Sequence, residues 1–279
     1  MTRKFFVMLP PPGHATMPQL SQILLYPIKS LDGFAVTAAA LLPGGALQGD
    51  REFAIVDAQD QVINAKRTPK IHRLRSQFDL PKRLIYLQVQ GESASFHLDR
   101  QRPALETWLG DFFEQPVRLI QNLETGFPDD LDSTGPTIIS EATLKTVASW
   151  YPGLDCEAIR RRFRTNLELD APEPFWEDRL FGEPDIPISF QIGAVAFQGI
   201  NPCQRCPVPT RHPETGEVYA GFQKTFVAKR KETLPEGVVR SRFNHFYRLT
   251  INTQVPRSEA GKVLRLGDKV QLGSHTGAA

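Results

Sequence analysis

The sharpest chemical feature of the sequence is a pair of cysteines separated by two residues. Cys203 and Cys206 lie in the segment 199–216, GINPCQRCPVPTRHPETG, which is rich in proline and charged side chains. Buried free cysteines are usually inert core residues. A segment of this composition makes a poor core strand, so the pattern indicates a chemical role for at least one of the two thiols.

Three kinds of site use cysteines in similar patterns. A closed zinc site needs four ligands, whereas Cys203, Cys206 and His212 supply three without a matching second pair. A thioredoxin-like motif lies at the start of a helix, which the prolines directly after the motif disfavour. A single thiolate bound to a soft metal centre fits better, because Arg205 beside Cys206 would favour the ionised sulfur.

The composition argues against several other functions. The 279 residues include 33 Lys and Arg against 31 Asp and Glu, a net charge of +2, so nothing pulls the whole chain toward nucleic acid or anionic membrane. No stretch approaches the 18 apolar residues of a membrane-spanning helix. Three cysteines argue against a disulfide framework, and a ferredoxin-type cluster needs four thiolates. We therefore expect a cytoplasmic protein.

The first half of the chain reads as short strands with a turn signal about every ten residues, which is typical of a barrel or sandwich. We predict strands at 20–27, 34–42, 53–56, 61–64, 74–80, 84–90 and 94–98. Leu105, Trp108, Leu109 and Phe112 then form a helical stripe.

The second half adds two predicted helices before returning to strands. Ser140 suits the N-cap of a helix that reaches about Tyr151, and a short helix starts at Asp155. Further strands are predicted at 164–169, 188–191, 194–197, 247–252 and 269–272.

The polar segment 122–135 marks a domain boundary. We predict a disordered tail at 1–18, a first domain at 19–121 and a second at 122–273, with a frayed end after it. The fold class is mainly β with a few helices (α+β).

The cysteine segment resembles the signature of the MOSC family, P-C-x-R-C-x-V-x-T-x-x-P-E-T-G. The family is named for the C-terminal domain of molybdenum cofactor sulfurases and includes the mitochondrial amidoxime-reducing components. Further elements resemble those of the family in the same order: YPIKS at 26–30, GDR at 49–51, ISEA at 139–142, RFRTNL at 162–167, WED at 176–178 and LGDKV at 266–270. The resemblance covers residues 19–272.

The resemblance implies an N-terminal β-barrel-like domain followed by a MOSC β-barrel domain. It also implies that Cys206 binds the metal of the molybdenum cofactor (Mo-molybdopterin) and is the catalytic residue, with Cys203 in a structural or supporting role. The expected cofactor-contacting residues are Lys29, Ser30, Arg51, Ser140, Glu141, Arg164, Asn166, Arg205 and Cys206.

Simple electrostatics supports this set. The anionic phosphate of a pterin favours Arg and Lys, and it also suits the N-terminus of a helix, such as the one predicted at Ser140. Glu141 would then contribute its backbone N–H, because its carboxylate repels a phosphate. In the basic run 160–164 we expect Arg162 to face solvent, and Asp178 is a candidate hydrogen-bonding partner of ligand or substrate.

The resemblance implies a reductase of small N-hydroxylated compounds. Its electrons would come from a separate donor, such as a ferredoxin or a flavin or cytochrome reductase, because the chain has too few cysteines for a cluster of its own. The alternative is a protein that carries the cofactor, or a sulfur atom on Cys206, without turnover. The two hypotheses differ in whether a substrate reoxidises the reduced cofactor.

Overall fold

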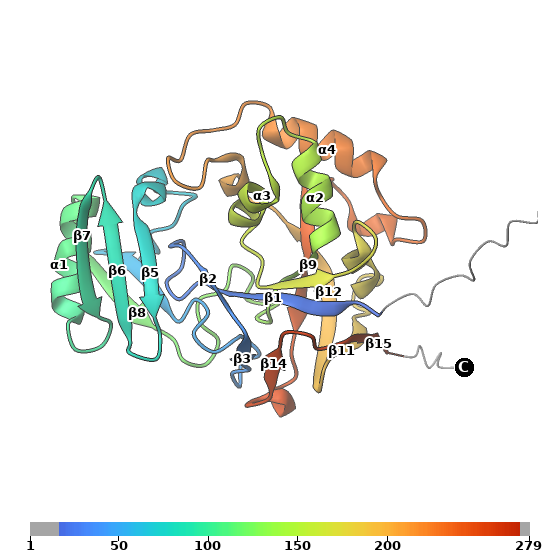
Figure 1. Ribbon diagram of the computed structural model, residues 1–279, viewed down its shortest axis with the longest axis horizontal. Coiled ribbons are helices and arrows are strands. Elements are labelled where there is room, and N and C mark those ends of the chain that lie inside the picture. The colour runs from blue at the N-terminus through green and yellow to red at the C-terminus, as the bar shows by residue number, and fades with distance from the viewer. Residues whose placement is uncertain (1–16, 274–279) are drawn as a thin grey trace, which may run out of the picture.

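Residues 17–273 are described by the computed structural model, which confirms the α+β class with a majority of strands. The tail predicted at 1–18, apart from its last two residues, and the frayed end predicted after 273 lie outside this range. Figure 1 shows a smaller lobe that carries α1 and a larger lobe in which α2, α3 and α4 lie together beside the main sheet.

The main sheet has eight strands and joins both halves of the chain. In spatial order they are β15 (Val270–Leu272), β11 (Ile188–Ile192), β12 (Val195–Gln204), β13 (Arg248–Gln254), β9 (Ile138–Ser140), β10 (Leu167–Asp170), β1 (Gln19–Leu25) and β2 (Phe34–Val36). Only β9 and β10 pair in parallel. The first strand, β1, therefore pairs directly with β10, although the polar segment 122–135 separates the two strands in the sequence.

The main sheet curls but does not close. One bridge, between Gln19 and Lys269, brings the start of β1 close to β15. Within residues 17–273 there is no ladder of several residue pairs between these two strands. The strand β15 contributes only three residues, all paired with β11. Strands β3 (Ala38–Ala40) and β14 (Val263–Arg265) form a separate pair. The barrel-like arrangement expected from the resemblance is therefore open within residues 17–273.

The smaller lobe packs two small sheets against one helix. Its elements are β4 (Phe53–Asp57) paired with β8 (Val117–Gln121), the three strands β5 (Arg75–Asp79), β6 (Leu84–Val89) and β7 (Glu92–His97), and α1 (Arg102–Phe113). Leu105 and Leu109 of α1 are fully buried, as the predicted stripe requires. Removing these side chains from water is what holds α1 to the lobe.

Two of the three α-helices in the larger lobe begin where the sequence predicts. Ser140 caps α2 (Glu141–Ser149) by accepting a hydrogen bond from the Thr143 amide at 3.2 Å. Asp155 caps α3 (Cys156–Phe163) in the same way, from the Ala158 amide at 2.7 Å. The third helix, α4 (Phe222–Glu232), was not predicted, because it has no side-chain cap and little apolar surface besides Phe222 and Phe226.

The strand predictions were wrong in several places. The segment 61–64 contributes only one bridge, between Val56 and Val62, and 34–42 divides into β2 and β3, which belong to different sheets. The short strands β8, β9 and β14 were missed. Their pairing partners lie far away in the sequence, so local patterning gives little sign of them.

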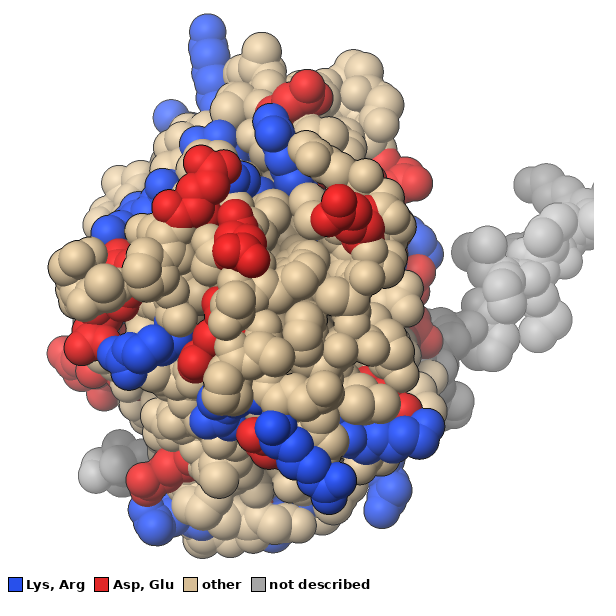
Figure 2. All heavy atoms as spheres, turned by 90° about the vertical axis from the view of Figure 1, so that its left-hand side faces the viewer, with Lys and Arg blue, Asp and Glu red and all other residues tan. Residues whose placement is uncertain are grey.

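No helix within residues 17–273 is long and apolar enough to cross a membrane. Figure 2 shows one end of the molecule with cationic and anionic side chains interspersed across it. This face of the molecule therefore carries charge of both signs.

Candidate functional site

A cavity of about 800 Å³ gathers seven of the nine residues that the sequence nominates. These are Lys29, Ser30, Arg51, Arg164, Asn166, Arg205 and Cys206. They come from the loop after β1, the turn before β4, the end of α3 and the segment after β12. The volume is within the usual range for a site that binds a cofactor or a drug-sized molecule.

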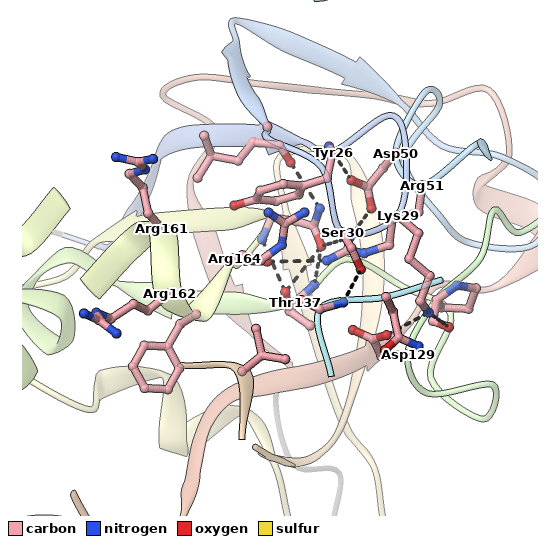
Figure 3. Close-up of a pocket in the computed structure, with 18 of the residues that line it drawn as sticks. Tyr26, Lys29, Ser30, Asp50, Arg51, Asp129, Thr137, Arg161, Arg162 and Arg164 are labelled. Atoms are coloured by element: carbon pink, nitrogen blue, oxygen red, sulfur yellow. Dashed lines mark hydrogen bonds and ion pairs between the residues drawn. The ribbon is translucent and has the colours of Figure 1, made fainter. Parts of the chain in front are cut away.

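Two arginines lie against the ring of Tyr26 at the centre of the cavity wall (Figure 3). The guanidinium carbon of Arg164 is 4.2 Å from the centre of the ring, and that of Arg51 is 5.2 Å from it. Burial raises the pKa of Tyr26 to about 12. The phenol is therefore neutral at physiological pH and serves as a rigid cation–π platform for both arginines.

Arg51 is fixed by a short network. It forms an ion pair with Asp50, and it donates to the side-chain oxygen of Asn166 at 3.3 Å. Burial disfavours the charged form of Arg51, but Asp50 outweighs this effect and the pKa of Arg51 is raised. Asp50 is itself held by the amide of Tyr26 at 2.8 Å. The network keeps Arg51 ionised and oriented.

Arg164 has no carboxylate partner among the described residues. It donates to the carbonyl of Leu31 at 2.6 Å, and burial lowers its pKa. An anion that entered the cavity would restore the solvation that this guanidinium lost on burial.

Three of the lining residues have left-handed backbone conformations. The φ angles are 73° at Ser30, 47° at Arg51 and 54° at Arg164, which ends α3. Such conformations cost non-glycine residues on the order of 1–3 kcal/mol, and they cluster at functional sites. All three residues line the same cavity, so the energetic cost of these backbone conformations indicates that the direction of their side chains matters there.

Lys29 ties the segment after β8 to the cavity wall. Its ammonium group donates to the carbonyls of Phe127 at 3.0 Å and Pro128 at 2.9 Å, and it pairs with Asp129 at 2.7 Å. The positive charges of Lys29, Arg51 and Arg205 lower the pKa of Asp129 to about 2. Asp129 is consequently an ionised carboxylate within a cationic cavity.

The cysteine segment leaves the main sheet through irregular pairing. The register of β12 against β13 shifts twice, and the second shift sets Cys203 opposite two residues of β13. One of them, Thr250, has a φ angle of 71°, which is strained for a β-branched residue. Bulges of this kind re-aim side chains next to functional sites.

Arg205 contacts Cys203, whereas the sequence predicts an effect of Arg205 on Cys206. Its guanidinium lies 3.2 Å from the sulfur of Cys203, and it also donates to the carbonyl of Phe163 at 2.8 Å. Cys206 is half-buried and lines the cavity, and its sulfur has no hydrogen-bond partner among residues 17–273.

Arg162 is buried, so the prediction that it faces solvent was wrong. Only 4% of its surface is exposed, and it donates to the carbonyls of Pro209 at 3.0 Å and of Arg211. Figure 3 shows Arg162 pointing away from the Lys29–Asp129 pair. Arg162 borders the cavity, but its donors hold the segment that follows Cys206.

Ser140 and Glu141 do not line the cavity. The cap turns the hydroxyl of Ser140 back toward Thr143, whose hydroxyl donates to the buried carboxylate of Glu177 at 3.0 Å. Glu141 instead pairs with Lys145 on the surface of α2 at 2.8 Å. The start of α2 is thus closed by the protein itself, and the expected phosphate site at this helix end is not formed.

Asp178 is likewise removed from the cavity. It forms an ion pair with Arg230, and the two side chains are only 5% and 1% exposed. The suggested contact of Asp178 with ligand or substrate is therefore not available in this structure, because its partner is internal.

Two family models match the chain. Residues 17–114 match the MOSC N-terminal beta barrel domain, and residues 137–271 match the MOSC domain. The chain belongs to the MOSC family. The cavity of this MOSC protein draws Lys29 and Arg51 from the first matched region and Arg164 and Cys206 from the second, whereas Asp129 lies between them.

The chain is similar to proteins named molybdenum cofactor sulfurase. The relatives from Danio rerio, Solanum lycopersicum and Homo sapiens are 26%, 24% and 21% identical over 67%, 71% and 71% of this chain. These matches cover 27%, 30% and 27% of the relatives, so the chain spans less than a third of their length. The likeness therefore concerns one part of those proteins.

Sequence reasoning missed several residues of the cavity. Tyr26 and Asp50 belong to the YPIKS and GDR elements, but only the basic residues and the serine of these elements were nominated. Thr137, which lines the cavity and hydrogen-bonds Asn166, directly precedes β9. Asp129 carried no signal, because an acidic residue in a polar connecting segment is ordinarily a solvated surface group.

Proposed function

We propose that this protein binds the molybdenum cofactor in the cavity, with Cys206 as the metal ligand. The observation that carries the proposal is the meeting of a cysteine sulfur without a hydrogen-bond partner and several arginines on one cavity wall. Thiolates suit soft, sulfur-rich metal centres, and arginines suit the phosphate of a pterin. The donor set therefore fits both ends of this cofactor.

The residues that line the cavity have different roles in the proposed binding. Arg164 and Arg205 have no carboxylate partner within residues 17–273 and supply positive charge for the phosphate, while Asp50 holds Arg51 in its orientation. Ser30 and Asn166 add neutral polar groups beside them. Arg162 holds the segment after Cys206 through two backbone carbonyls, so the thiolate would approach the metal from a fixed direction.

The reaction we propose is the reduction of small N-hydroxylated compounds. When bound, the cofactor supplies the two-electron chemistry that removes oxygen from an N–O bond. The polypeptide supplies a sulfur ligand, electrostatic orientation and a polar cavity. Electrons would come from a separate donor, such as a ferredoxin or a flavin or cytochrome reductase, in a reducing compartment such as the cytoplasm.

A second candidate is transport of the cofactor, or of a sulfur atom on Cys206, without turnover. The names of the similar proteins favour it, since all the relatives described above are called cofactor sulfurases. The two candidates share the cavity and Cys206. They differ in whether an N-hydroxylated substrate reoxidises the reduced protein.

The first experiment measures molybdenum by mass spectrometry in protein purified from a host that makes the cofactor. We expect about one molybdenum per wild-type chain, little or none in Cys206→Ala, and retention in Cys203→Ala as the matched control. Reoxidation by a hydroxylamine or amidoxime then separates reductase from carrier. Equal molybdenum in wild type and Cys206→Ala, or none in either from a competent host, contradicts the proposal.

A further inference from the structure

The carboxylate of Asp129 already occupies the cationic part of the cavity (Figure 3). Its side chain is 82% exposed, and one of its oxygens lies 2.7 Å from the ammonium nitrogen of Lys29. Arg51 and Arg205 are close enough to lower its pKa together with Lys29, so the carboxylate is ionised throughout the physiological range. An anion of the protein itself thus sits among the groups expected to attract an anionic ligand.

The contacts of Lys29 show what a ligand must displace. An ammonium group has three N–H donors, and those of Lys29 are directed to the carbonyls of Phe127 and Pro128 and to the carboxylate of Asp129. The two carbonyls belong to the backbone and cannot leave without moving the segment. The Asp129 side chain can rotate into solvent by a change of rotamer, so it is the partner that can be exchanged.

We propose that Asp129 is an internal competitor that makes the cavity select against small free anions. A carboxylate tethered one and two residues from the two carbonyls that hold Lys29 acts at a high effective concentration. Inorganic phosphate would have to displace it and would gain few other contacts. A larger ligand with a phosphate group, held also through Cys206 and the rest of the cavity, has additional contacts that offset the displacement.

This inference deepens the proposed function, because it concerns the same cavity, but its test needs no metal. Protein purified from a host without molybdenum cofactor synthesis is titrated calorimetrically with inorganic phosphate. We expect Asp129→Asn and Asp129→Ser to bind phosphate about tenfold more tightly than wild type, because a repelling charge near the anion is gone.

The matched control is Asp132→Asn, which removes the same charge from an exposed residue of the same segment that does not line the cavity. Its phosphate affinity should stay within about twofold of wild type. Adding Lys29→Met to Asp129→Asn should abolish the gain. Unchanged or weaker phosphate binding in both Asp129 variants overturns the inference, as does an equal gain in Asp132→Asn. Neither result bears on whether Cys206 holds molybdenum.

Discussion

Arg162 and Arg164 lie two residues apart at the end of α3 and serve different regions of the molecule. Arg162, still within the helix, points inward and donates hydrogen bonds to backbone carbonyls of the segment after Cys206. Arg164 follows the helix in a left-handed conformation, which turns its guanidinium over Tyr26 and toward the cavity. The change of backbone direction, rather than the residue type, separates an internal tie from a ligand-facing group.

Two ion pairs of the protein differ in a similar way, because one is enclosed in the interior and the other faces the cavity. Arg230 and Asp178 are enclosed by aromatic rings, with the Arg230 guanidinium carbon 4.1 Å from the centre of the Phe175 ring. The Lys29–Asp129 pair opens onto the cavity, where Asp129 is largely exposed. In this protein, a buried charge therefore does not by itself indicate a binding site, whereas a charge that faces the cavity does indicate one.

The largest effect should follow from breaking the enclosed pair. Arg230→Ala leaves Asp178 buried without a partner, and we expect the free energy of unfolding to fall by about 3–5 kcal/mol. Urea denaturation measures the change. The control is Arg179→Ala, which breaks the exposed pair with Glu173 and should cost less than about 1 kcal/mol. Similar losses in the two variants would show that enclosure does not distinguish the pairs.

Next in size is a paired test of the two arginines at the end of α3. Arg162→Met should lower the free energy of unfolding by about 2–3 kcal/mol, because two carbonyls lose a charged donor. Arg164→Met should change it by less than about 1 kcal/mol and instead weaken cofactor binding about tenfold. Denaturation curves and molybdenum content, measured on the same preparations, provide both values.

The opposite pattern would reverse the assignment of these two residues. If Arg164→Met destabilises the fold more than Arg162→Met, or if only Arg162→Met loses molybdenum from folded protein, then Arg164 is a structural tie and Arg162 acts on the ligand.

A smaller, pH-dependent effect should arise at Glu177 in the enclosed region. Burial, and then Asp178, raise the pKa of Glu177 from 4.5 to about 7, and one of its oxygens has no hydrogen-bond partner within residues 17–273. Its contribution to stability is complete below pH 4.5 and is lost as the pH rises through 7. Glu177→Gln stays neutral, so at pH 8 it should be more stable than wild type by about 2 kcal/mol.

Denaturation between pH 5 and pH 8 tests this expectation. The wild type should lose stability relative to Glu177→Gln across the interval, whereas the exposed control Glu173→Gln should run parallel to wild type. A difference between wild type and Glu177→Gln that does not vary with pH would show that Glu177 is already ionised at pH 5.

Several local features of this protein follow from short-range sequence patterns alone. The helix starts at Ser140 and Asp155 and the apolar stripe of α1 depend on residues within a few positions of one another, and the structure confirms all three. The ordered motifs also nominated seven residues that line the cavity, and they led to the MOSC family, which the family models confirm.

Which charged side chains face the cavity depends instead on the tertiary fold. The contact of Arg205 with Cys203, the enclosure of Arg162 and the position of Asp129 depend on strand register, left-handed residues and pairing between segments distant in sequence. A shift of one residue in strand register reverses the side to which a side chain points, and the residue's neighbours in the sequence do not reveal that shift. The tertiary fold therefore determined the direction of each charged group, while the sequence determined its identity.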